Sequence, residues 1–185
     1  MRQGERVQRH PLALLSGCGE LTTLDAAARL VHPGIVKVFD VTKYDGAPVI
    51  VMEFVKGRSL ADIIEQDGPL PPKDVARLGL ALLDALQTAH QAGIVHRDLK
   101  PANVLITDRR TVITDFGVAA LAGDPSITRS GTVLGTPAYM APEQAQGHNV
   151  GPTADLWALG ATLYTTVEGH PPTSETPSCP SSRPC

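Results

Sequence analysis

Asp98, Asn103 and Asp115 have the residue types and the spacing of a site that handles phosphate groups. A carboxylate can accept a proton, and amide and carboxylate oxygens are hard ligands that Mg²⁺ takes beside phosphate oxygens. Asp98 and Asn103 lie five residues apart, and Asp115 follows two short apolar runs, residues 104–106 and 112–114. A hairpin formed by these runs would bring Asn103 and Asp115 to the same end. The pattern therefore predicts a site for phosphoryl transfer.

Single Asp and Asn residues in loops more often cap turns and helices than carry out chemistry. Further motifs argue against that interpretation here. Residues 96–103 have the sequence HRDLKPAN, residues 114–117 TDFG, residues 135–143 GTPAYMAPE and residues 155–160 DLWALG. In this order the four segments resemble the eukaryotic-type (Hanks-type) serine/threonine protein kinases. The third segment and the composition rich in Ala, Leu, Val and Gly are most similar to bacterial, especially actinobacterial, members.

The resemblance implies an α+β fold with a small β lobe and a mainly helical large lobe, and it implies the use of ATP and Mg²⁺. It assigns the proton of the substrate hydroxyl to Asp98, neutralisation of charge on the transferring phosphate to Lys100, and Mg²⁺ to Asn103 and Asp115. Lys100 and Thr136 resemble the branch that acts on Ser and Thr rather than Tyr. The expected partners are therefore ATP and protein substrates that offer those hydroxyls.

Two runs rich in β-branched residues, 35–41 and 48–54, are separated by the turn sequence YDG and predict a hairpin. The resemblance makes the end of the second run the hinge that leads to the large lobe. Met52 would be the gatekeeper, and the backbone of Glu53 and Val55 would contact adenine. Leu105 would form the apolar floor beneath the base. An ordinary strand end is the alternative interpretation.

Arg97 carries a fixed positive charge next to the predicted proton acceptor, and the resemblance implies that it serves regulation by pairing with a negative group. Thr128 and Ser130 lie where an added phosphate could supply that group. The alternative is that both hydroxyls belong to a flexible loop without a regulatory role. His96 is predicted to be a packed, hydrogen-bonded residue and neither a catalyst nor a metal ligand.

Apolar residues at spacings of three and four predict a long buried helix over residues 73–92, and residues 24–30 also have helical spacing. Ser59 resembles the cap at the start of a shorter helix. A further helix that carries Asp155 is expected to start after Thr153 as its cap. The resemblance implies that Asp155 holds the backbone of the predicted catalytic loop.

Parts of a kinase domain are expected to be missing. The nearest candidate for the glycine-rich phosphate lid is the weak segment 17–19, and Lys37, the first lysine, follows the helix that a phosphate-gripping lysine should precede. The C-terminal helices are expected to be missing as well. The predicted organisation is a divergent segment 1–24, a partial kinase domain 25–172 with a small-lobe remnant 25–55 and a large lobe 56–172, and a disordered tail rich in Ser and Pro at 173–185.

These expectations predict a serine/threonine protein kinase that is weak or inactive as this chain. One alternative is a kinase remnant without catalysis that acts as a binding module, or the product of a mis-framed gene. Another is a phosphotransferase for small molecules, which the four motifs disfavour.

Composition excludes several other classes of protein. The net charge is −3 and no run of Lys or Arg exceeds two residues, so a nucleic-acid partner is not expected. Three cysteines without a CxxC pair suit a reducing cytosol. The apolar run 11–15 is shorter than the roughly 7–15 residues that form the core of a secretory signal, and no segment approaches the roughly 20 apolar residues of a membrane helix. The sequence thus predicts a cytoplasmic protein with no transmembrane segment.

Overall fold

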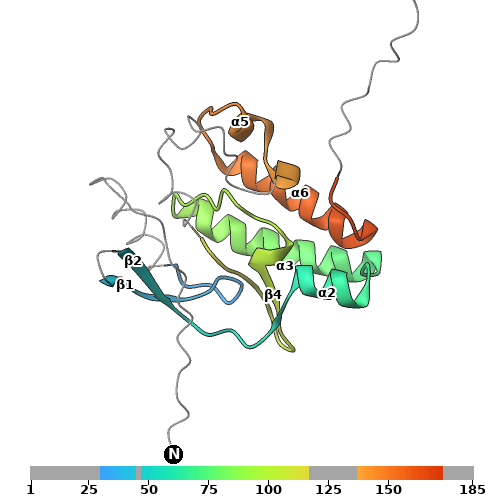
Figure 1. Ribbon diagram of the computed structural model, residues 1–185, viewed down its shortest axis with the longest axis horizontal. Helices are drawn as coiled ribbons and strands as arrows, with labels where there is room; N and C mark the ends of the chain where they lie inside the picture. Colours follow the sequence, from blue (N-terminus) through green and yellow to red (C-terminus); the bar gives the residue numbers. More distant parts are fainter. Residues whose placement is uncertain (1–29, 45–46, 117–136, 173–185) are drawn as a thin grey trace, which may run out of the picture.

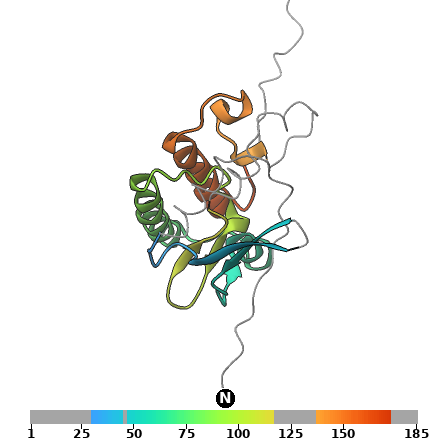
Figure 2. The ribbon, with the colours of Figure 1, turned by 90° about the vertical axis from the view of Figure 1, so that its left-hand side faces the viewer.

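The computed structural model describes residues 30–44, 47–116 and 137–172, which form the α+β fold predicted from the sequence (Figure 1). The two long helices, α3 (Pro72–Gln91) and α6 (Pro152–Glu168), pack against each other on one side of the strands (Figures 1 and 2). The predicted helix over residues 24–30 lies outside the described residues except for its last residue. Within the described ranges, no helix combines the length and the apolar character that crossing a bilayer requires.

Strands β1 (Val38–Tyr44) and β2 (Ala47–Met52) form an antiparallel hairpin, which confirms the prediction from the β-branched runs. Its register pairs Val38 with Met52 and Tyr44 with Ala47, with an irregularity between Val38 and Asp40. The hairpin is joined to the rest of the fold at its base. There the Val36 N–H donates to the carbonyl of Ile113 at 2.9 Å.

A second sheet carries the predicted site residues. It has the order β3 (Arg58–Ser59), β4 (Val104–Ile106) and β5 (Thr111–Ile113), with antiparallel neighbours. Strands β4 and β5 are the two arms of the predicted apolar hairpin. Because they are joined by a short turn, the residues before β4 and after β5 lie side by side, and the Thr114 N–H donates to the Asn103 carbonyl at 2.9 Å.

The shorter helix α2 (Leu60–Asp67) starts as predicted, because the Ser59 hydroxyl accepts a hydrogen bond from the Asp62 N–H at 3.0 Å. The cap predicted for α6 is wrong. That helix begins at Pro152, and the Thr153 hydroxyl donates to a Glu143 carboxylate oxygen at 3.5 Å. Proline suits the first turn of a helix, because its fixed φ is already helical and its missing N–H would have no partner there.

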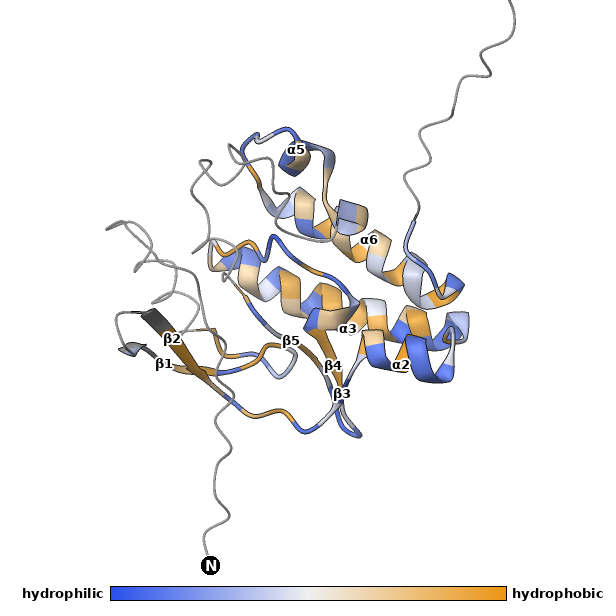
Figure 3. Cartoon of the chain, in the orientation of Figure 1, coloured by the Kyte–Doolittle hydropathy of each residue, from blue (hydrophilic) through white to orange (hydrophobic). Residues whose placement is uncertain are grey.

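The core lies between α3, α6 and the second sheet. Apolar residues colour one face of α3 and the strands β4 and β5 (Figure 3). The side of α3 that faces the core carries the periodic residues seen in the sequence, namely Val75, Leu78, Leu82, Ala85, Leu86 and Ala89. Each fully buried leucine contributes about 1.5–3 kcal/mol relative to an exposed one. The loop between α3 and β4 therefore starts from a rigid support.

Gly57 offers a test of how closely the hinge segment packs on the second sheet. A Cβ added at Gly57 would lie 2.5 Å from the carbonyl oxygen of Ile106, a backbone atom of β4. We expect Gly57→Ala to lower the free energy of unfolding by about 1–3 kcal/mol, because backbone must shift to relieve the overlap. Urea unfolding followed by circular dichroism measures the change.

Gly160→Ala is the matched control for this replacement. Gly160 lies exposed within α6, and a Cβ added there meets nothing within 4 Å. We expect the free energy of unfolding of that variant to rise by roughly 0.5–1 kcal/mol, because alanine loses less backbone entropy than glycine when it is fixed in a helix. A Gly57→Ala variant as stable as Gly160→Ala would contradict the close packing.

Candidate active site

Two predicted residues, Lys100 and Asn103, contact the carboxylate of a third, Asp98. The Lys100 ammonium lies 2.7 Å from Asp98 Oδ2, and Asn103 Nδ2 donates to the same oxygen at 3.2 Å. Asn103 Nδ2 also donates to the Asp98 carbonyl at 2.8 Å. The chain turns after Asp98 through the short 3₁₀ helix η1 (Pro101–Asn103), whose last residue is Asn103. Asp98 is partly exposed, so its carboxylate is both oriented by neighbours and open to a ligand.

Asn103 and Asp115 lie next to each other at the end of the β4–β5 hairpin. The Asn103 carbonyl accepts from the Thr114 N–H, and the Thr114 hydroxyl lies 3.3 Å from both that carbonyl and Asp115 Oδ2, either of which can accept its proton. Asp115 adopts φ 60°, a left-handed conformation that is uncommon for residues other than glycine. Strain of this kind is often found at functional sites.

These two residues could hold a Mg²⁺ ion. Both donors of the Asn103 amide are directed at Asp98 oxygens, so the side chain keeps its Oδ1 for another partner. Within the described residues no group of three or more His, Cys, Asp or Glu could hold a metal by itself. Mg²⁺ is usually bound by one or two protein groups together with substrate phosphates.

Asp155 at the start of α6 holds the loop in which Asp98 lies. Its carboxylate is fully buried and accepts from the backbone N–H groups of His96 and Arg97, both at 2.8 Å. His90 Nε2, from the last turn of α3, lies 2.7 Å from Asp155 Oδ2. The two backbone bonds confirm the role that the resemblance implied for Asp155. They also stabilise Arg97 at φ 68°.

His90 is not among the residues that the sequence motifs indicate. Its partner is 65 residues away, and the helical pattern of α3 describes burial but not pairing. No local signal marks such a contact. It adds a third donor to the buried carboxylate.

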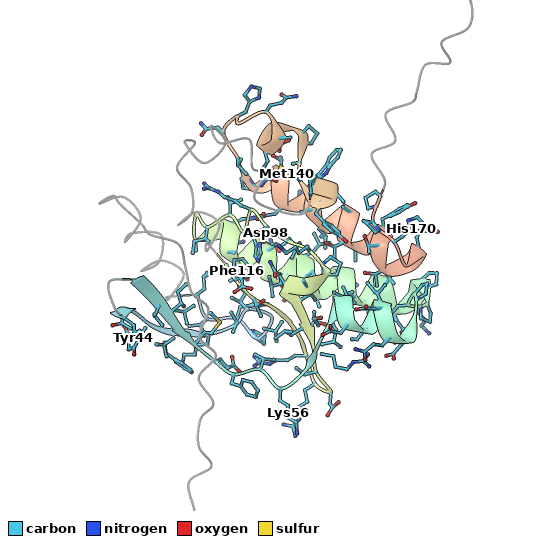
Figure 4. All side chains as sticks on the ribbon, viewed as in Figure 1. Tyr44, Lys56, Asp98, Phe116, Met140 and His170 are labelled. Atoms are coloured by element: carbon cyan, nitrogen blue, oxygen red, sulfur yellow. The ribbon has the colours of Figure 1, made fainter. Side chains whose placement is uncertain are left out.

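His96 is buried and fully bonded, as predicted. Its Nε2 lies 2.8 Å from the Thr114 carbonyl and therefore donates, so Nδ1 is the acceptor for the Asp98 N–H at 3.2 Å. The ring packs edge-on against Phe116, with 4.7 Å between centroids. Figure 4 labels Asp98 and Phe116 in this region, beside α3. Burial lowers the pKa of His96, which keeps the imidazole neutral.

The predicted hinge residues also come together. Met52 belongs to a buried cluster with Val36, Val38, Ile50 and Val112, against which Val55 and Leu105 pack. The Glu53 N–H donates to the Lys37 carbonyl at 2.8 Å, and its carboxylate pairs with the Arg110 guanidinium. A shallow cavity of about 240 Å³ is lined by residues 53–56 and 107–110. Arg110 was not singled out in the sequence, because its partner lies 57 residues away.

The predicted regulatory residues and the predicted substrate-loop residue Thr136 remain to be placed. Arg97 is exposed, and within the described ranges no carboxylate lies within ion-pair distance of its guanidinium. Thr128, Ser130 and Thr136 lie outside the described residues. The candidate segment for the phosphate lid, residues 17–19, also lies outside the described residues.

The protein kinase domain family matches residues 19–181 of the chain, a span that includes every residue of this site. The chain belongs to the protein kinase family. The resemblance found in the four motifs is thereby confirmed. The described elements are part of a protein kinase fold.

Actinobacterial serine/threonine kinases are among the relatives of this kinase chain. It is 43% identical over 152 residues to the serine/threonine-protein kinase PknB of Mycobacterium leprae, an alignment that covers 79% of this chain and 24% of that protein. It is 42% identical over 148 residues to the serine/threonine-protein kinase PkaA of Streptomyces coelicolor, covering 78% of this chain and 27% of the other. The kinase chain thus spans about a quarter of the length of these curated relatives.

A solved structure supports the fold. The kinase chain resembles the crystal structure of a mutant of the Mycobacterium tuberculosis PknI kinase domain, with a TM-score of 0.71 and 32% identity. The match covers 85% of this chain and 59% of that one. The predicted kinase-like α+β fold is therefore confirmed.

Proposed function

We propose that this chain is a serine/threonine protein kinase that transfers the γ-phosphate of ATP to Ser or Thr hydroxyls of proteins. The observation that carries the proposal is the arrangement around Asp98, where Lys100 and Asn103 contact one carboxylate oxygen. Asp115 lies beside Asn103 through Thr114. A proton acceptor, a cation and two hard oxygen ligands are then close enough to act on one phosphate group.

In the proposed reaction Asp98 orients the substrate hydroxyl and accepts its proton. The hydroxyl oxygen forms a bond to the γ-phosphorus, the bond from that phosphorus to the β–γ bridging oxygen breaks, and ADP leaves with the electron pair. Lys100 compensates negative charge on the transferred group. Its ion pair with Asp98 keeps both side chains in place before the substrate binds.

Asn103 and Asp115 are the proposed Mg²⁺ ligands, through the amide Oδ1 and the carboxylate. When bound, the ion would neutralise charge on the phosphates of ATP. The left-handed backbone at Asp115 and the Thr114 hydroxyl, which lies 3.3 Å from Oδ2, place the carboxylate before any ion arrives.

The proposed adenine site lies at the hinge. Met52 and Leu105 supply apolar surface, and the Glu53 carbonyl and the Val55 N–H supply one acceptor and one donor for the base. Since Glu53 donates its own N–H to Lys37, the hinge backbone is already fixed on the side of the first hairpin. With the proposed division of the domain into a small-lobe remnant, 25–55, and a large lobe, 56–172, the nucleotide would bind at the boundary.

Protein substrates and regulation belong to the same proposal. Lys100 and Thr136 are the residues that favour Ser and Thr hydroxyls as acceptors. Arg97 is the proposed partner of a phosphate on Thr128 or Ser130, since its guanidinium is exposed beside the proposed catalytic residue. Phosphopeptide mapping of the active protein tests whether Thr128 or Ser130 carries a phosphate.

Nucleotide binding tests the proposed Mg²⁺ ligands separately from transfer. We expect Asp115→Asn to weaken binding of a non-hydrolysable ATP analogue in the presence of Mg²⁺ by at least roughly 10-fold, because even residues that only support a metal ligand typically cost that much when replaced. The same variant should change binding without Mg²⁺ much less. Isothermal titration calorimetry with and without Mg²⁺ measures both.

Glu65→Gln is the control, because Glu65 is an exposed acidic residue of α2. It should leave both affinities unchanged. If the affinity of Asp115→Asn for the ATP analogue depends on Mg²⁺ as strongly as that of the unaltered chain, Asp115 is not a Mg²⁺ ligand. A folded chain that binds no nucleotide under any of these conditions would favour the non-catalytic remnant instead.

A further inference from the structure

The peptide group that joins Arg97 to Asp98 is held on both sides by side chains. The Asp98 N–H donates to His96 Nδ1 at 3.2 Å, and the Arg97 carbonyl accepts from Gln144 Nε2 at 2.8 Å. His96 belongs to the same loop, whereas Gln144 belongs to helix α5 (Pro142–Ala145), 47 residues further along the chain. The orientation of the peptide before Asp98 thus depends on a distant glutamine.

The amide of Gln144 is itself fixed in direction. Its Oε1 accepts from the Ala141 N–H at 3.1 Å, and the Gln144 N–H donates to the Ala141 carbonyl at 3.0 Å. Because Oε1 is taken by a donor, only Nε2 can meet the Arg97 carbonyl. A glutamine suits the position, since its side-chain amide offers both an acceptor and donors at the end of a chain of this length.

We propose that Gln144 is a positioning residue for Asp98. It holds the carbonyl of Arg97 while Asp155 holds the Arg97 N–H, so a residue in a left-handed conformation is secured on both sides. Among the described hydrogen bonds, the Gln144 bond is the one that joins the segment 137–145 to the loop that carries Asp98. A change in that segment would therefore reach Asp98 through Gln144.

The geometry of the Arg97–Asp98 peptide matters because small displacements of a catalytic group have large effects on rate. The proposal rests on the proposed function only in treating Asp98 as the proton acceptor. The hydrogen bonds of His96 and Gln144 to this peptide form whether or not the chain transfers phosphate. Their effect can be measured without an activity assay.

The test uses the full chain and the variant Gln144→Glu. Glutamate keeps the length of the side chain and an acceptor for the Ala141 N–H, but it cannot donate to the Arg97 carbonyl. Amide hydrogen exchange measured by NMR at Asp98 is expected to become about five- to tenfold faster, the effect of losing one hydrogen bond. Where the variant also transfers phosphate, kcat should fall while the KM for ATP stays unchanged.

Gln146→Glu is the matched control, with the same change in charge two residues away on an exposed side chain. Its exchange at Asp98 should equal that of the unaltered chain. If Gln144→Glu does not give a cooperative melt, Gln144→Met replaces it, because methionine has a similar length and no donor.

Equal exchange at Asp98 in the unaltered chain, the Gln144 variant and the Gln146 control would overturn the proposal. Faster exchange only in the Gln144 variant supports it. If the Gln144 variant shows this faster exchange but the unaltered chain never transfers phosphate, the positioning role of Gln144 stands and the proposed kinase function is wrong.

Discussion

Replacing Asp155 by alanine is expected to lower the free energy of unfolding by about 3–5 kcal/mol, as when one partner of a buried charged pair is removed. The carboxylate is fully buried, and the N–H groups of His96 and Arg97 and the ring of His90 all depend on it. Without it, buried donors lose their acceptor and the left-handed conformation at Arg97 loses its support. Chemical denaturation monitored by circular dichroism gives the change.

Glu168→Ala is the control for Asp155→Ala. Glu168 is an exposed acidic residue at the other end of the same helix. Its removal should change stability by no more than about 0.5 kcal/mol, as is usual for surface positions. An Asp155→Ala variant that unfolds at the same denaturant concentration as this control would show that the buried carboxylate does not hold the loop.

Asp98→Asn is expected to reduce phosphate transfer by about 10²- to 10⁴-fold, the usual contribution of a general base. Asparagine retains an oxygen that can accept from Asn103, but it cannot take up the proton of the substrate hydroxyl. Transfer of labelled γ-phosphate to a peptide that contains one serine measures the loss. The loss is expressed relative to the transfer rate of the unaltered chain.

Binding of the ATP analogue distinguishes a loss of proton transfer in Asp98→Asn from general damage to the site. Asp98→Asn should bind the ATP analogue with Mg²⁺ as the unaltered chain does, since the proposed ligands Asn103 and Asp115 are retained. Glu65→Gln should transfer phosphate at the unaltered rate. If transfer by Asp98→Asn matches that of Glu65→Gln, Asp98 is not the proton acceptor.

Much of the fold and of the candidate site could be predicted because it is encoded locally. Asp98, Lys100 and Asn103 lie within six residues, so their contacts follow from one short loop and the 3₁₀ turn. The β4–β5 hairpin carries Asn103 and Asp115 to one end because its two arms pair with equal length. The periodicity of α3 likewise identified its buried face, and its burial by the rest of the fold agrees with that pattern.

The sequence by itself thus determined the two hairpins, the helices α2 and α3, the family motifs and the residues of the candidate site that are neighbours along the chain. Only the tertiary structure decided that His90 meets Asp155, that Arg110 pairs with Glu53 and that Gln144 bonds to the Arg97 carbonyl, across 65, 57 and 47 residues. Patterns of polarity predict which side chains are buried or exposed. They do not predict which distant donor meets which acceptor, because that depends on how the packed helices and strands place them relative to one another.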